Sequence, residues 1–139
     1  MRVVLGACKS GSDLMGLIAE ALADDGCDVA LVDADDFVSL AQRMSELLLD
    51  DPESLGLAID SFGVGTYMAA SKVKGMVAAC ISDERSAYMT REHNDCRLLC
   101  IGSKVVGPAI ATKIAREFIG ADYAGGRHQV RVDMLAKMA

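Results

Sequence analysis

Several features that would assign a small protein to a function class are missing from this sequence of 139 residues. Basic charge is scarce, because 14 lysines and arginines face 20 aspartates and glutamates and give a net charge of −6. This balance argues against broad nucleic-acid binding but is compatible with a local basic pocket for an anionic metabolite. No apolar run approaches the length of a membrane span. We therefore expect a small-molecule ligand, and neither nucleic acid nor membrane as a partner.

Metal-binding spacing is also missing. The five cysteines form no C-x-x-C pair, and the two histidines are not spaced with them as zinc ligands would be. Most of the cysteines, Cys80 and Cys100 among them, lie within apolar runs, which is typical of reduced, buried thiols. The N-terminus enters a strand-like run at once, without the pattern of a signal peptide. We expect no metal site and a cytoplasmic protein.

What the sequence does contain is a regular alternation of strand-like and helix-like segments. Five runs rich in Val, Leu and Ile are nearly continuous in apolar residues, as in parallel strands covered on both faces. They are Arg2–Ala7, Asp28–Asp33, Leu55–Asp60, Val77–Ser82 and Arg97–Gly102. Helix-like segments lie between them at Ser12–Asp24, Asp36–Leu49 and Asp83–His93, and a further one follows at Ala109–Ile119.

This alternation predicts the α/β class, with a Rossmann-like three-layer α/β/α sandwich built on a five-stranded parallel sheet. The length fits a single domain over residues 1–139. The amphipathic ending Val132–Met138 is detached from the alternating core. We expect it to form a terminal helix that extends to a partner subunit.

Ligands of open α/β sheets bind at the carboxyl ends of strands, so the residues that follow each run are the candidates. The turn Gly63-Val-Gly65 is either an anion cradle or an ordinary strand-to-helix turn. Asp60 at its lip is either a general base or a cap, the latter being more common. Lys9 and Lys104 follow other strands and are either phosphate contacts or surface charges.

Two further groups of residues are candidates for proton transfer and anion binding. His93 could exchange a proton near neutral pH, although a histidine near a helix C-terminus can simply favour the helix dipole. Arg127 and Arg131 are four residues apart, so on a helix both would share one face and could clamp a phosphate. A solvated basic face is the usual alternative. The preceding Gly125-Gly126 and the adjoining His128 favour anion binding.

Four motifs in register along nearly the whole chain resemble one known family. They are Gly63-Val-Gly65, Lys72-Val-Lys-Gly75, Arg91-Glu-His-Asn94 and Gly125-Gly-Arg-His128. The family is that of type B ribose-5-phosphate isomerase and galactose-6-phosphate isomerase. Within it, the segments 81–91 and 126–135 are most similar to the LacA branch.

The resemblance implies interconversion of aldose and ketose phosphates without a metal or other cofactor. In the family a histidine helps to open the sugar ring, a cysteine moves a proton between C1 and C2, and arginines hold the phosphate. The ring-opening histidine matches His93, the adjacent asparagine matches Asn94, and the phosphate arginines match Arg127 and Arg131. The cysteine position holds Asp60 instead.

The other side of the pocket departs from the family as well. Phe62 stands where active relatives have a threonine, and Cys8-Lys9 replaces their Asp-His pair. Cys8 is no substitute base on this interpretation, because it follows a different strand.

In the family each active site lies between subunits, so a chain with only one half of it needs a partner. The resemblance therefore implies a LacA-type chain completed by a cysteine-bearing LacB-type subunit, acting on D-galactose 6-phosphate and D-tagatose 6-phosphate. Alone it is expected to form a homodimer. Two alternatives stay open: a self-sufficient isomerase with Asp60 as base, and a non-catalytic sugar-phosphate-binding subunit.

Overall fold

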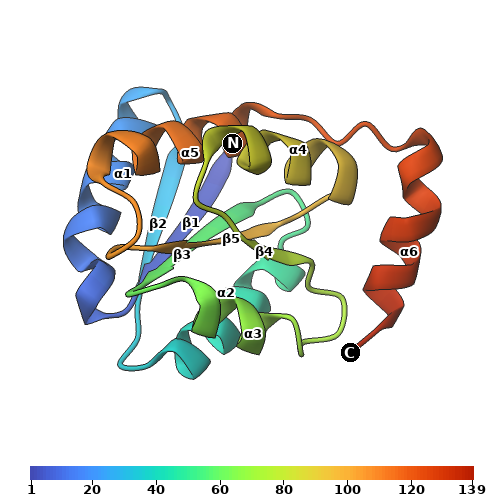
Figure 1. The fold of residues 1–139 in the computed structure, drawn as a ribbon, viewed down its shortest axis with the longest axis horizontal. Helices are drawn as coiled ribbons and strands as arrows, with labels where there is room; N and C mark the ends of the chain where they lie inside the picture. The colour runs from blue at the N-terminus through green and yellow to red at the C-terminus, as the bar shows by residue number, and fades with distance from the viewer.

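The structure is a computed structural model that describes residues 1–139. A five-stranded sheet with the order β2-β1-β3-β5-β4 crosses the molecule, and all of its strand pairs are parallel (Figure 1). The strands are β1 (Arg2–Ala7), β2 (Asp28–Asp33), β3 (Leu55–Asp60), β4 (Ala78–Cys80) and β5 (Leu98–Gly102). The predicted sheet is thus confirmed, and its order places the carboxyl ends of β1 and β3 side by side.

Six α-helices and two short 3-10 helices join and flank the strands. The α-helices are α1 (Ser12–Asp24), α2 (Phe37–Asp50), α3 (Val64–Ala70), α4 (Glu84–Asn94), α5 (Pro108–Gly120) and α6 (Gln129–Lys137). The 3-10 helices are η1 (Lys9–Gly11) and η2 (Gly126–His128). No helix has the combination of length and hydrophobicity that a bilayer crossing requires.

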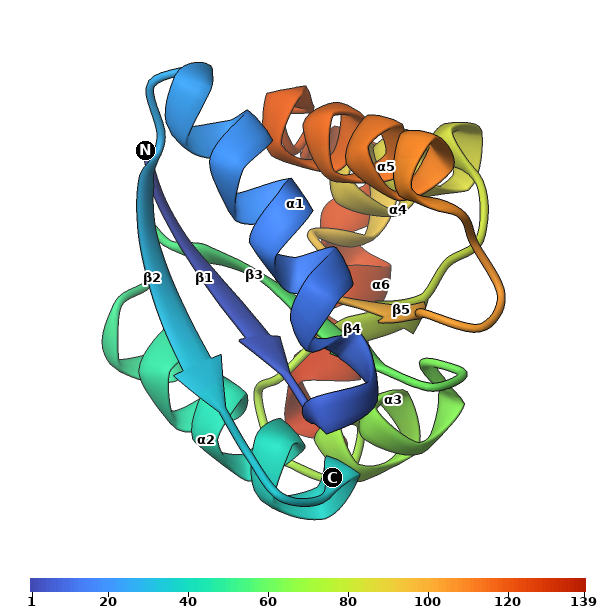
Figure 2. The same ribbon diagram turned by 90° about the vertical axis from the view of Figure 1, so that its left-hand side faces the viewer.

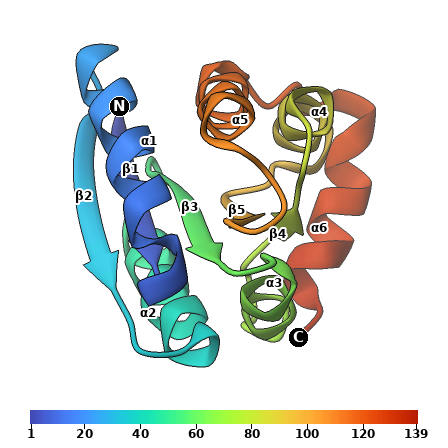
Figure 3. The same ribbon diagram turned by 60° about the vertical axis from the view of Figure 1, so that its left-hand side comes forward.

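The helices cover both faces of the sheet, as the continuous apolar strands predict. Figures 2 and 3 show α1, α4 and α5 on one face and α2 and α3 on the other. Each face has its own buried cluster, one around Phe118 of α5 and Ile18 of α1, the other around Leu40 and Met44 of α2. Two such layers hold the strand ends rigidly, which fixes the loops that follow them.

Beyond shifts of a single residue, three elements differ from the sequence prediction, one being the C-terminal helix, which begins at Gln129 rather than Val132. The fourth strand spans only Ala78–Cys80 rather than Val77–Ser82, because it lies at the sheet edge and pairs with β5 alone. Helix α3 was not predicted at all, since its sequence is short and begins with the glycine-rich turn.

The C-terminal helix α6 stands at one side of the molecule, next to α4 and the edge of the sheet (Figure 1). Val132 is its only buried residue, and its large apolar side chains Val130, Met134 and Leu135 are exposed. A terminal helix is therefore present as expected. Its extension to a partner subunit stays a prediction.

Candidate active site

The loop between β3 and α3 is closed by the carboxylate of Asp60. One carboxylate oxygen accepts hydrogen bonds from the backbone N–H of Phe62, at 3.1 Å, and from that of Gly63. The other oxygen accepts from the Thr66 backbone N–H at 3.2 Å and from its hydroxyl at 2.7 Å. The side chain is buried, with 8% of the residue exposed. The amides that could face an external anion are thus already bound to the chain's own carboxylate, which favours the cap interpretation of Asp60.

Two glycines make this tight loop sterically feasible. Gly63 has φ +79°, a left-handed conformation that residues with a Cβ rarely adopt. Gly102 ends β5 directly against the loop, and a Cβ on it would lie 2.6 Å from the carbonyl carbon of Phe62. The loop is therefore pressed against the neighbouring strand end and has little room to open.

A cleft of about 450 Å³ lies at this end of the sheet, where β1 and β3 end. Its lining includes the carboxylates of Asp35, Asp36 and Asp60 and contains no lysine or arginine. Phe62 projects at its rim with 60% of its surface exposed. Three carboxylates without a compensating cation make this cleft unfavourable for a phosphate.

Cys8 also lines this cleft and is buried. Burial raises the pKa of the Cys8 thiol, and nearby carboxylates, first among them that of Asp60, raise it further. A thiol with a raised pKa is mostly protonated at neutral pH and is a poor base. The raised pKa disfavours Cys8 as a substitute for the cysteine base that the resemblance implies.

The second group of candidate residues lies at the C-terminal end of α4. His93 lies in the last turn of the helix, and its Nε2 is 3.4 Å from a carboxylate oxygen of Glu92. Asn94 is the final helical residue, and its side-chain oxygen accepts a hydrogen bond from the Thr90 hydroxyl at 3.1 Å. The imidazole of His93 remains partly exposed, so a ligand can reach it.

The segment after α5 brings two arginines to the same region. Arg127 lies in η2 and Arg131 in the first turns of α6, so the two are not on one α-helix as the sequence spacing suggested. Both are exposed and neither is in an ion pair. Next to Arg127, the ring of His128 stacks on that of His93, with 4.3 Å between ring centroids. The structure thus joins the histidine to the arginine-bearing segment.

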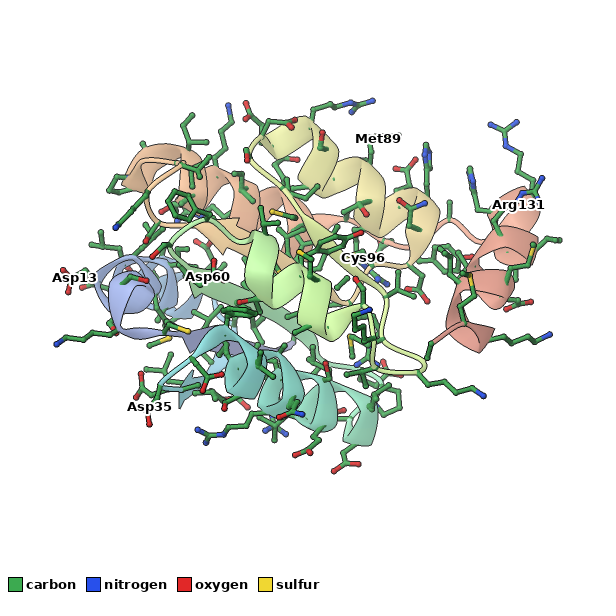
Figure 4. The ribbon with its side chains drawn as sticks, turned by 60° about the horizontal axis from the view of Figure 1, so that its bottom comes forward. Asp13, Asp35, Asp60, Met89, Cys96 and Arg131 are labelled. Atoms are coloured by element: carbon green, nitrogen blue, oxygen red, sulfur yellow. The ribbon has the colours of Figure 1, made fainter.

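Within one chain the two groups of residues do not meet. Figure 4 shows Asp60 near the carboxyl end of the sheet and Arg131 at the opposite side of the molecule, on α6. A groove of about 680 Å³ separates α3 and β4 from α6, and its lining includes Tyr67, Cys80 and Asn94. Within one chain, α6 with Arg131 thus lies across this groove from α3 and β4.

The two lysines singled out in the sequence lie elsewhere on the surface. Lys9 lies in η1 and faces a separate pocket that also contains Asp33 and Arg43. Lys104 follows β5 and is exposed beside the start of α5. Neither lines the acidic cleft, so neither restores positive charge there.

Comparison with known proteins identifies the family. The family model described as Ribose/Galactose Isomerase matches residues 3–135. The chain belongs to this ribose/galactose isomerase family. The resemblance stated from the motifs is thereby confirmed.

Several curated members of the family are similar over their full length. The galactose-6-phosphate isomerase subunit LacA of Streptococcus equi subsp. equi is 50% identical over 141 residues, with 100% of both chains covered. The corresponding subunit of Lactococcus lactis subsp. lactis is 46% identical, with 99% of both chains covered.

Solved structures of the family have the same fold. The ribose-5-phosphate isomerase B of Clostridium thermocellum has 31% identity and a TM-score of 0.90, over 98% of this chain and 95% of that one. The Mycoplasma genitalium enzyme with bound ribulose-5-phosphate has 31% identity and a TM-score of 0.89, over 97% and 93% of the two chains. The predicted fold class is confirmed by this agreement.

Two residues of this member of the ribose/galactose isomerase family escaped the sequence analysis. Thr66 completes the cap on Asp60, and nothing in the sequence indicates that the carboxylate turns toward it. His128 was noted only as a neighbour of Arg127, because its contact with His93 joins residues far apart in the chain. Both roles depend on side-chain direction, which spacing does not encode.

Proposed function

We propose that this chain is the LacA-type subunit of a galactose-6-phosphate isomerase, which converts D-galactose 6-phosphate into D-tagatose 6-phosphate. The observation that carries the proposal is the state of the β3–α3 loop. Both carboxylate oxygens of Asp60 accept hydrogen bonds from the loop backbone and from Thr66, while His93 and the arginines remain accessible. Half of an aldose–ketose isomerase site is present and the other half is closed. Full-length similarity to LacA subunits supports this assignment.

In the proposed mechanism Arg127 and Arg131 bind the sugar's phosphate group, since guanidinium groups suit phosphate oxygens in charge and geometry. His93 transfers a proton during opening of the sugar ring, because an imidazole can both donate and accept near neutral pH. Asn94 orients the substrate with its side-chain amide. No metal or cofactor takes part.

The proton between C1 and C2 is moved by a thiolate that a LacB-type partner contributes from its own β3–α3 loop. The partner's loop would enter the groove between α3, β4 and α6, beside Asn94. Residues 1–139 act as one isomerase domain in this assembly. The isolated chain pairs with itself, giving a homodimer that lacks the thiol in both of its sites. The five free cysteines fit the reducing cytoplasm as the place of action.

Mixing the purified chain with a LacB-type subunit tests the proposal. Neither subunit alone is expected to isomerise galactose 6-phosphate at an appreciable rate, and the mixture is expected to be active. Arg131→Met in this chain, or Cys→Ser in the partner's loop, should abolish the activity of the mixture.

The alternatives give different outcomes in the same assay. Strong activity of this chain alone would support Asp60 as a base and contradict the half-site proposal. Sugar-phosphate binding by calorimetry without turnover in any mixture would instead indicate a binding subunit.

A further inference from the structure

The ring of His128 lies flat against the ring of His93. Their centroids are 4.3 Å apart and their planes differ by 16°, which is a stacked pair. The two residues come from different elements, the last turn of α4 and the end of η2. The stack is therefore a tertiary contact between helix α4 and the arginine-bearing segment.

The backbone before η2 is shaped to make this contact. The Ala124 N–H donates to the Glu92 carbonyl at 3.0 Å, which ties the segment to α4 one residue before His93. Gly125 and Gly126 then both have positive φ, +62° and +58°, and turn the chain back. A positive φ is rarely adopted by residues with a Cβ, and Gly125, with ψ −129°, lies in a region that is essentially restricted to glycine. The turn places His128 over His93.

His93 has little else to hold its ring. Its Nε2 is 3.4 Å from Glu92, an adjacent residue in the helix, and 36% of its side chain is exposed. Rotation about the outer torsion of a histidine is intrinsically broad. Without the stack, the imidazole could turn away from a bound sugar.

We propose that His128 is a positioning residue, which holds the imidazole of His93 and couples it to phosphate binding. Arg127 precedes His128 directly and Arg131 follows three residues later, so a phosphate bound by the arginines fixes the segment that carries His128. Through the stacking contact, the fixed ring of His128 then restricts the rotation of the His93 imidazole. The role of His93 in ring opening and the binding of phosphate by Arg127 and Arg131 rest on the proposed function, whereas the stack itself does not.

Proton NMR of the isolated full chain tests the coupling, because the protein has only two histidines. The His93 ring signals should be shifted by the ring current of His128. His128→Ala should remove this shift, and His128→Phe should keep one because it retains a stacked ring. Val130→Ala, a change at an exposed position two residues on, is the matched control and should leave the His93 signals in place.

Inorganic phosphate is the probe for the second step. Its addition to the wild-type chain should move the side-chain N–H signals of Arg127 and Arg131 together with the ring signals of His93. In His128→Ala the arginine signals should still move and the His93 signals should not. Unchanged His93 signals in the wild type, or a full response in His128→Ala, would overturn the coupling.

The kinetics of the mixture with a LacB-type subunit distinguish a positioning role of His128 from a purely structural one. Loss of positioning should lower kcat of His128→Ala by roughly tenfold to a hundredfold, with a smaller change in KM because the arginines remain. His128→Phe should recover most of kcat. Equal loss in the Phe and Ala variants would contradict a positioning role. An inactive wild-type mixture would refute the proposed function while leaving the NMR result to decide on the stack.

Discussion

Asp60 directs both of its carboxylate oxygens to the backbone and side chain that follow it, and this decides the chemistry of the β3–α3 loop. A carboxylate that accepts four hydrogen bonds at a helix start is held in one orientation. It satisfies the three backbone N–H groups and the Thr66 hydroxyl that donate to it. A general base instead needs a free lone pair aimed at a substrate proton. The sequence allowed both roles, and the hydrogen bonds favour the cap.

Replacing Asp60 by Asn tests this residue-scale conclusion. An amide NH₂ cannot accept hydrogen bonds, so one side of the cap is left unmatched in a buried position. We expect the free energy of unfolding to fall by about 2 kcal/mol, measured by urea denaturation. Once folded, the variant mixed with a LacB-type subunit should keep its isomerase activity.

Asp35→Asn is the matched control for this substitution, because Asp35 is an exposed aspartate lining the same cleft. Its unfolding free energy should change by less than about 0.5 kcal/mol. If Asp60→Asn were as stable as this control, the cap would not be what closes the loop.

At the scale of elements, helix starts carry much of the local order. Asp36 begins α2 and Asp83 begins α4, each accepting a hydrogen bond from a backbone N–H three residues on, at 2.8 Å in both cases. These backbone hydrogen bonds lower the pKa of both carboxyls. The start of helix α4 at Asp83 could be predicted from the sequence, because an N-cap and the N–H group it binds lie close together in the chain. The start of helix α3 was not, since its N-cap is Gly63 and the carboxylate that accepts from its first turn belongs to Asp60, a strand residue.

The cap of α4 gives a pH-dependence prediction. A carboxyl whose pKa is lowered on folding stabilises the fold fully above the ordinary aspartate pKa of about 3.9. This stabilisation is lost as the pH falls through the lowered value. Asp83→Ser caps without titrating, so the wild-type excess in urea midpoint should be present at neutral pH and shrink in acid.

Asp28→Ser serves as the control, because Asp28 is exposed at the start of β2 and caps no helix. Its urea midpoint should follow that of the wild type across the pH range. A difference between wild type and Asp83→Ser that stays constant with pH would contradict ionisation of this cap.

At the scale of the whole molecule, the body and the C-terminal arm (residues 125–139) have different tasks. The body consists of the sheet and its two helical layers, whereas the arm buries only Val132 among the residues of α6. Yet the arm carries both arginines and His128. Stability therefore resides in the body, and phosphate binding is assigned to the arm.

Removing the arm should separate these tasks. A chain that ends at Ala124 is expected to unfold with a free energy lower by no more than about 3 kcal/mol, the value of one buried valine and the His128–His93 stack. Mixed with a LacB-type subunit, it should give no isomerase activity, because it lacks Arg127 and Arg131. Full-length Arg127→Met, Arg131→Met is the control and should be equally inactive with unchanged stability. Failure of the truncated chain to fold would show that the arm is part of the core.

The α/β class, five parallel strands and the family could be predicted from the amino-acid sequence, because continuous apolar runs, glycines and motif spacing are properties of neighbouring residues. The sequence also marked His93, Asn94, Arg127 and Arg131 as candidates. The hydrogen bonds that Asp60 accepts from its own loop and the stacking of His128 on His93 became visible in the folded chain alone. The fold likewise set the arginines apart from the loop. These features depend on side-chain direction and on contacts between distant segments, which linear spacing does not contain.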